Sequence, residues 1–142
     1  MLIAEILRTK GAAVVTVDTD TTVAQLLTEL SRHNIGAVVV THNGTLAGIA
    51  SERDVVRRLD EYGADLLSAP VADIMTAVVI TCAPSDTVDT LTMLMTENRV
   101  RHVPVLSEGN LMGIVSIGDV VKSHISQLEQ HRRQLEAYIT QG

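Results

Sequence analysis

The segment GIASERDVV at residues 48–56 recurs as GIVSIGDVV at residues 113–121. Glycine, isoleucine, serine, aspartate and a pair of valines keep their places at a constant offset of 65 residues. Over a longer span, residues 13–56 align on residues 78–121 without a gap, with 15 identities in 44 positions. A repeat of this length indicates that one structural unit occurs twice in the chain.

Hydrophobic periodicity and turn residues predict the element order β-α-β-β-α for the first copy. The valines of residues 14–17 favour a strand, and apolar residues at helical spacing from Val23 favour a helix. Asn43-Gly44 is the strongest short hairpin signal. The predicted elements are a strand at 14–17, a helix from Val23 whose end Asn34 and Gly36 bracket, strands at 37–40 and 46–50, and a helix from Ser51. The buried stripe of the first helix is expected at Val23, Leu26, Leu27 and Leu30.

The second copy predicts the same order. Its elements are strands at 79–82, 102–106 and 111–115, helices at 87–98 and from 116, and a turn at 108–110. Short amphipathic segments at 3–8 and 71–76 precede the two copies. The predicted division is therefore residues 1–60 for the first unit with its lead-in helix, 61–70 for a turn-rich linker, 71–125 for the second unit and 126–142 for a helical extension.

A three-stranded sheet with helices on one side cannot bury its other face alone. Two such units solve this problem by packing against each other. The predicted fold is α+β, with two β-α-β-β-α repeats packed sheet to sheet about a pseudo-twofold axis.

The composition limits the classes of protein to which the chain can belong. Hydrophobic residues make up 46% of it, with no Phe or Trp, so the core must be aliphatic. A net charge of −6 disfavours a nucleic-acid binder. No apolar run has the length of a membrane span and the N-terminus lacks the pattern of a signal peptide, so we expect a cytoplasmic protein. Cys82 is the single cysteine and is expected to be a small buried hydrophobe, with no metal site.

The last helix is expected to continue beyond the second unit. Ile125, Leu128, Leu135 and Ile139 lie at heptad-like spacing, and Arg132 occupies one of the expected apolar positions. Packing of this tail against a second subunit is favoured, which predicts a homodimer. The alternative is that the tail folds back on its own domain.

The repeated motif has a coherent binding chemistry. Ser51 and Ser116 stand at predicted helix starts, where free N–H groups favour an anion. Asp54 and Asp119 follow one helical turn later, and a carboxylate can accept hydrogen bonds from the two vicinal hydroxyls of a ribose. The alternative is a serine N-cap with an aspartate in the first turn, which needs no ligand.

Several motifs in the same order carry a family resemblance. Residues 71–76 read VADIMT, residues 101–105 read RHVPV, and each copy ends in Gly-hydrophobic-x-Ser-x-x-Asp. Together they resemble the CBS domain pair, or Bateman module, over roughly residues 3–125. The resemblance implies a regulatory module that binds adenosine compounds, requires no cofactor and commonly dimerises into a disc. It implies AMP, ADP, ATP or NAD as ligand ahead of S-adenosylmethionine.

The resemblance also implies an apolar adenine slot in each copy. Its residues are Val14, Val15, Ile35, Gly36 and Ile49 for the first site, and Thr76, Val79, Ile80, Val100, Arg101 and Ile114 for the second.

Basic residues differ between the copies. Arg53 matches a position that holds phosphate in some family members, whereas its counterpart is Gly118. Arg101 and His102 match phosphate-contacting positions, and their counterparts are uncharged. We therefore expect Arg53, Arg101 and His102 to form one cluster and the two sites to be unequal. The alternative is a solvated Arg101 and a structural His102.

The sequence contains no Walker loop, nucleophile elbow or paired carboxylates at catalytic spacing, so we do not expect an enzyme. The favoured function is an energy- or redox-sensing module that binds an adenosine nucleotide and acts through an unknown effector protein. The alternatives are a ligand-free structural adaptor or dimerisation protein, an enzyme that uses the nucleotide as substrate, and, against the net charge, a nucleic-acid binder.

Overall fold

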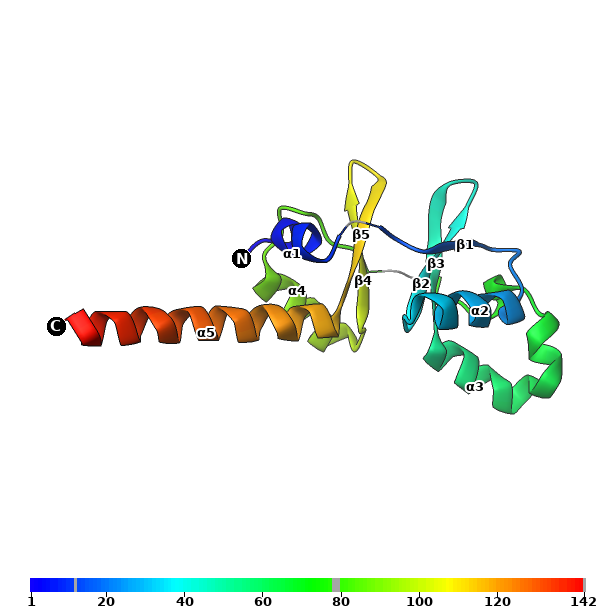
Figure 1. Ribbon diagram of the computed structural model, residues 1–142. Coiled ribbons are helices and arrows are strands. Elements are labelled where there is room, and N and C mark those ends of the chain that lie inside the picture. The colour runs from blue at the N-terminus through cyan, green and yellow to red at the C-terminus, as the bar shows by residue number, and fades with distance from the viewer. Residues whose placement is uncertain (12, 78–79, 142) are drawn as a thin grey trace.

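The computed structural model of the protein describes residues 1–11, 13–77 and 80–141. Its first half contains α1 (Ile3–Lys10), β1 (Thr16–Asp18), α2 (Val23–His33), β2 (Ala37–His42), β3 (Thr45–Ser51) and α3 (Glu52–Tyr62). After the 3₁₀ helices η1 (Gly63–Ser68) and η2 (Val71–Asp73), the second half contains α4 (Val88–Asn98), β4 (His102–Ser107), β5 (Asn110–Ser116) and α5 (Ile117–Gln141). The two sheets face each other, with helices outside (Figure 1). The predicted α+β fold of two repeats is confirmed.

Each half contains an antiparallel hairpin with the same tight turn. Asn43 and Gly44 have φ angles of 52° and 79°, and Glu108 and Gly109 have φ angles of 51° and 79°. Two successive positive φ angles match the right-handed twist of the paired strands. Both turns therefore lie where the sequence predicted them.

The second sheet is less extensive than predicted. In the first half, β1 pairs with β2 in parallel, and the Val39 N–H donates to the Val15 carbonyl at 3.3 Å. The counterpart of Val39 is Pro104, which has no N–H to donate. Of the predicted strand at 79–82, Val79 lies outside the described residues, and Cys82 forms an isolated parallel bridge with Val105.

The hydrophobic core consists of two aliphatic clusters, as the composition predicts. The predicted stripe of α2 is buried at Val23, Leu26 and Leu30, but Leu27 lies at the edge of the cluster and is 37% exposed. Cys82 is buried as predicted, and burial is the main cause that raises the pKa of its thiol to about 12.

The lead-in segments exchange places between the halves. Ile3 and Ile6 of α1 are buried in the cluster of the second half. Conversely, Leu66, Val71 and Ile74 are buried in the cluster of the first half. Each core is therefore completed by a segment that precedes the other repeat, and the sequence boundaries do not coincide with the packing units.

The linker predicted at 61–70 is helical for most of its length, where its composition indicated turns. Helix α3 extends to Tyr62, and η1 follows directly. Leu66 has no exposed surface, so its burial in the first core holds this segment in a helical conformation.

Helix α5 extends far beyond the second half as one continuous helix (Figure 1). Every residue from Leu128 to Thr140 is exposed, so the tail does not fold back on its own domain. Among the helices that the structure describes, none combines the length and the apolar character of a membrane span.

Candidate functional site

The repeated serine and aspartate form the same capping arrangement in both halves. Asp54 Oδ2 accepts hydrogen bonds from the Ser51 backbone N–H at 2.8 Å and from Ser51 Oγ at 3.0 Å. The Asp54 N–H donates back to Ser51 Oγ at 3.3 Å. Ser116 and Asp119 repeat these contacts at 2.8, 3.0 and 3.2 Å. These bonds start α3 and α5 and fix both carboxylates at the ends of β3 and β5.

A segment of the second half completes the site around Asp54. Ile49 of β3 and Thr76 exchange two backbone hydrogen bonds, of 3.1 and 2.8 Å. Gly48 permits this approach, because a Cβ atom there would lie 2.5 Å from the Thr76 carbonyl oxygen. The group that approaches this glycine most closely is therefore the backbone of Thr76.

A cavity of about 550 Å³ opens beside this junction. Ser51 and Asp54 line it at the start of α3, and Ile49, Ile80 and Val100 contribute apolar surface. Its volume lies within the ordinary range of small-molecule pockets. The cavity therefore has the size and the mixed polarity that suit a nucleotide.

The cavity combines residues that the sequence assigned to different sites. Gly36, Ile49, Ser51, Arg53 and Asp54 come from the expected first site, and Thr76, Ile80, Val100, Arg101 and His102 from the expected second site. The lining of this cavity therefore differs from the expected division of the slots by repeat. The lead-in exchange explains the difference, because it brings Thr76 of the second repeat alongside β3 of the first.

Four guanidinium groups line the cavity. Arg53 and Arg101 were expected, and all three residues of the cluster predicted from them and His102 line this cavity. Arg57 and Arg99 were not expected as site residues. A signal for Arg57 was available, since it lies one helical turn after Arg53 on α3. Arg99 caps the C-terminal end of α4 with a φ of 55° and also lines the cavity.

These four positive charges outnumber the two acidic groups in the lining, Glu52 and Asp54. The chain as a whole has a net charge of −6. The concentration of positive charge in the cavity favours an anionic ligand.

His102 is half-buried in the cavity wall. Burial lowers the pKa of its imidazole below the ordinary value, and the nearby positive charges of Lys10 and Arg101 act in the same direction. Asp119 and Glu52 oppose them without reversing the shift. A bound anion would favour the protonated form of this ring.

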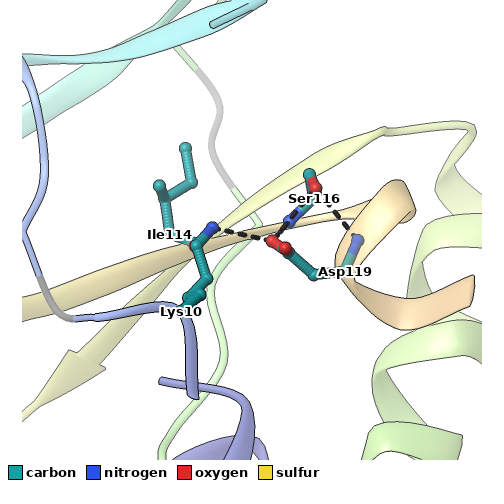
Figure 2. Close-up of polar contacts among 4 residues, drawn as sticks. All are labelled: Lys10, Ile114, Ser116 and Asp119. Atoms are coloured by element: carbon teal, nitrogen blue, oxygen red, sulfur yellow. Dashed lines mark hydrogen bonds and ion pairs between the residues drawn. The ribbon is translucent and has the colours of Figure 1, made fainter. Parts of the chain in front are cut away.

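Lys10 distinguishes the second carboxylate from the first. Its Nζ atom lies 2.7 Å from Asp119 Oδ2 and donates to the Ile114 carbonyl at 2.8 Å. Figure 2 shows the contact between Lys10 and Asp119. Partial burial alone would raise the pKa of Asp119, but hydrogen bonds from Lys10 and Ser116 outweigh it and the pKa is lowered. The Asp119 carboxylate therefore has an internal counter-ion.

Lys10 was not predicted as a site residue from the sequence. The residue 65 positions after Lys10 is Met75, which has no charge and lies beside Gly48. A comparison of the two copies at this position would have shown the difference, but Lys10 precedes the aligned residues 13–56. This substitution adds to the unequal charge around the two aspartates that Arg53 and Gly118 already produce.

Among the described residues, the other expected ones do not line the main cavity. Val15 and Ile35 pack on the first core, and Val14 is half-buried. Ile35 lines a second, mainly apolar cavity of about 490 Å³ between α2 and α3. Ile114, Ser116 and Asp119 lie around Lys10, and Val79 lies outside the described residues.

Comparisons with known proteins agree with this architecture. The CBS domain family model matches residues 3–61 and 71–125. A curated relative from Arabidopsis thaliana, "CBS domain-containing protein CBSX3, mitochondrial", is 40% identical over 87% of this chain and 63% of its own. The chain therefore spans 63% of the length of that relative.

Solved structures have the same fold. The CBS-domain containing protein ATU1752 from Agrobacterium tumefaciens is 43% identical, with a TM-score of 0.85 over 87% of this chain and 99% of its own. The CBS domain pair of MJ0100, crystallised with 5′-methylthioadenosine and S-adenosyl-L-methionine, has a TM-score of 0.80 over 89% of this chain and 98% of its own. Its 23% identity supports likeness of fold alone.

Proposed function

The chain belongs to the CBS domain family, and on that premise we propose that it is a regulatory module that binds an adenosine nucleotide in the cavity beside Asp54. One observation carries the proposal. The cavity places a fixed carboxylate, apolar walls and four guanidinium groups around one space of about 550 Å³. These are the three kinds of surface that a ribose, a purine base and a phosphate chain require.

Asp54 is the proposed ribose contact. Its Oδ2 atom accepts both hydrogen bonds from Ser51, which fixes the orientation of the carboxylate and directs Oδ1 elsewhere. A carboxylate held in this way can accept from two vicinal hydroxyl groups at no further ordering cost. The start of α3 adds the positive end of a helix dipole for a nearby phosphate.

Cations around the cavity favour ligands that carry phosphate. Arg53 and Arg57 line it from α3, and Arg99 and Arg101 line it from the segment that joins α4 to β4. Guanidinium groups bind phosphate through paired N–H donors. We therefore favour AMP, ADP, ATP or NAD over an uncharged adenosine derivative, although MJ0100, which has the same fold, was crystallised with methylthioadenosine and S-adenosylmethionine.

The second aspartate is proposed as a weaker site. Lys10 occupies the Asp119 carboxylate at 2.7 Å, so a ribose would first have to displace an ammonium group. We expected two unequal sites. We now propose that the site at Asp54 is the principal one and that the site at Asp119 binds the nucleotide more weakly.

Regulation is proposed to act through the junction between the halves. A ligand in the cavity contacts α3, β3 and Thr76 from one side and Val100 to His102 from the other. If its contacts differ between two arrangements of the halves, binding shifts their populations. An effector protein that contacts one arrangement would respond to the nucleotide. We propose this role in place of catalysis, and keep the homodimer and the cytoplasmic location as predictions.

Thermal melting of the full chain tests the proposal. AMP, ADP, ATP, NAD, NADH and S-adenosylmethionine are each added at millimolar concentration, with CTP as a control for phosphate alone. A ligand at 100 times its Kd stabilises the folded state by about 2.7 kcal/mol. A rise in Tm with an adenosine nucleotide and none with CTP supports the proposal. No rise with any compound contradicts it and favours the ligand-free adaptor, in which the capping bonds of Asp54 and Asp119 serve only to start the helices.

A further inference from the structure

The exposed part of α5 is the surface that the nucleotide cavity does not explain. From Leu128 to Thr140 every residue is exposed, and Leu128, Leu135 and Ile139 are 63–73% exposed. A helix segment of this length without packing is only marginally stable in water. Its apolar side chains indicate that a partner covers them.

The apolar residues of α5 form one continuous seam. Val121, Ile125, Leu128, Arg132, Leu135 and Ile139 are separated alternately by four and three residues. This spacing is that of alternating d and a positions of a coiled coil, beginning with Val121 at d. Val120 and Ser123, which pack on the body of the protein, lie on a different face of the helix. The seam is therefore open along its whole length.

We propose that this seam pairs with the same seam of a second copy of the chain, and that the two helices run antiparallel. In an antiparallel pair centred at residue 130, each a position faces a d position. Val121 then lies opposite the partner's Ile139, and Ile125 opposite the partner's Leu135. Leu128 lies opposite the partner's Arg132.

The charge on Arg132 decides the orientation. In a parallel pair, residues at equal positions face each other, so Arg132 would be opposed by its own copy in the middle of an apolar seam. The antiparallel pair separates the two arginines and sets each against a leucine. In the single chain, Arg132 is 73% exposed and lies 3.7 Å from Glu136. This weak contact leaves it free to reorient.

Flanking charges favour the same orientation. Lys122 and Glu136 both follow a d position, and the antiparallel pairing brings Lys122 next to the partner's Glu136, twice by symmetry. The same register brings the two Glu129 carboxylates together, and Arg132 lies next to the partner's Glu129 and supplies the opposite charge. Opposite charges at these positions select partner and orientation.

Disulfide cross-linking tests the orientation. Ile125→Cys and Leu135→Cys are made singly and together in the full chain. Cys82 can stay, since its thiol is buried with a pKa of about 12. In the antiparallel pair, residue 125 faces residue 135 but is about 15 Å along the axis from its own copy, too far for a disulfide. The double variant should therefore form a covalent dimer under mild oxidation, and neither single variant should.

Two outcomes overturn the proposal. Cross-linking of the single Ile125→Cys variant would indicate a parallel pair. Absence of cross-linking in the double variant would show that the seam does not bind a second copy and serves another partner.

Sedimentation equilibrium supplies a second measurement, with Leu135→Glu in the seam and Gln130→Glu on the opposite face as a charge-matched control. Leu135→Glu should weaken dimerisation by about tenfold or more, because a buried leucine is lost. Gln130→Glu should leave it unchanged. Equal dissociation constants for the two variants would contradict the proposal. Neither position lies near the nucleotide cavity. The measurement of dimerisation and the thermal melting with nucleotides can therefore fail independently.

Discussion

Lys10 Nζ lies 2.7 Å from Asp119 Oδ2, across 109 residues of sequence, and gives one of two otherwise matching aspartates a counter-ion. Asp54 has the same capping bonds from its serine. Within the described ranges it forms no ion pair. The two halves therefore share a backbone arrangement and differ in charge at the position where a ligand hydroxyl would bind.

Replacement of Lys10 tests whether this contact closes the second site. Lys10→Met copies the residue found at the equivalent position, Met75. The Asp119 carboxylate would lose its counter-ion and become available to a ribose. We expect the stoichiometry of nucleotide binding to rise from one to two per chain, as measured by isothermal titration calorimetry. Lys122→Met, an exposed lysine of α5, is the control and should keep one site. A stoichiometry of one in Lys10→Met would contradict this role for Lys10.

The ion pair should also affect folding stability. Asp119→Asn and Asp54→Asn disturb the same capping bonds, but only the first removes a partner of Lys10. We expect Asp119→Asn to cost about 0.5–1 kcal/mol more in urea unfolding at pH 7. Because the pKa of Asp119 is lowered in the folded state, its contribution is present above the ordinary value and is lost as the pH falls through the folded pKa. The difference should shrink near pH 3; a constant difference at both pH values would exclude the ion pair as its cause.

His102 predicts a pH dependence of nucleotide affinity. Its pKa is lowered in the ligand-free protein, mainly by burial, so the imidazole is neutral at pH 7.5. Binding of a phosphate beside it would raise this pKa and take up a proton. Affinity for AMP should therefore increase between pH 8 and pH 6, by up to about tenfold for each unit of pKa change. His102→Asn should show a smaller increase, and adenosine, which lacks phosphate, should show none. Equal pH profiles for wild type and His102→Asn would contradict this assignment.

In the ligand-free protein, the lowered pKa of His102 also makes the folding stability depend on pH. The folded state binds a proton at His102 less readily than the unfolded state. The neutral ring therefore contributes stability above a pH of about 6.5, and this stability is lost as the pH falls through the lower folded pKa.

The glycines at equivalent positions of β3 and β5 predict unequal effects of the same substitution. A Cβ at Gly48 would lie 2.5 Å from the Thr76 carbonyl oxygen, which the backbone holds in place. A Cβ at Gly113 would lie 2.6 Å from Cδ2 of Leu7, the end of a flexible side chain. Gly48→Ala should therefore cost about 1–3 kcal/mol in urea unfolding and Gly113→Ala less. The order would be reversed, or the costs equal, if the junction at Thr76 could move freely.

Most of the fold could be predicted from the sequence because its signals are local. The hairpin at Asn43-Gly44 and the helix starts at Ser51 and Ser116 each depend on a few neighbouring residues. Asn43 and Gly44 adopt the positive φ angles that the turn requires, and both serines form the expected caps. Because the second copy has similar residues at equivalent positions, the same turn and strand predictions applied to it.

The exchange of lead-in segments could not be read from the repeat. Sequence similarity shows which residues occupy equivalent places, but not which copy supplies them. Ile3 and Leu66 have the apolar character of core residues in either arrangement. For this reason the adenine slots were divided by repeat, whereas most of their residues line one cavity.

Contacts of charged residues that lie far apart in the sequence could not be predicted either. Lys10 and Asp119 lie 109 residues apart, and Arg99 lines the cavity only because α4 ends beside Thr76 and Val100. Nothing in the local pattern of an arginine at a helix end distinguishes a ligand contact from a solvated side chain.

Calorimetric titration of wild type, Asp54→Ala and Asp119→Ala with the nucleotide that gives the largest melting shift tests the central claim most directly. Both variants lose the same capping bonds, so each is a structural control for the other. The cavity at Asp54 predicts that Asp54→Ala loses measurable binding, whereas Asp119→Ala binds one nucleotide per chain with wild-type affinity. Unchanged affinity in Asp54→Ala, or loss of binding only in Asp119→Ala, would contradict the account.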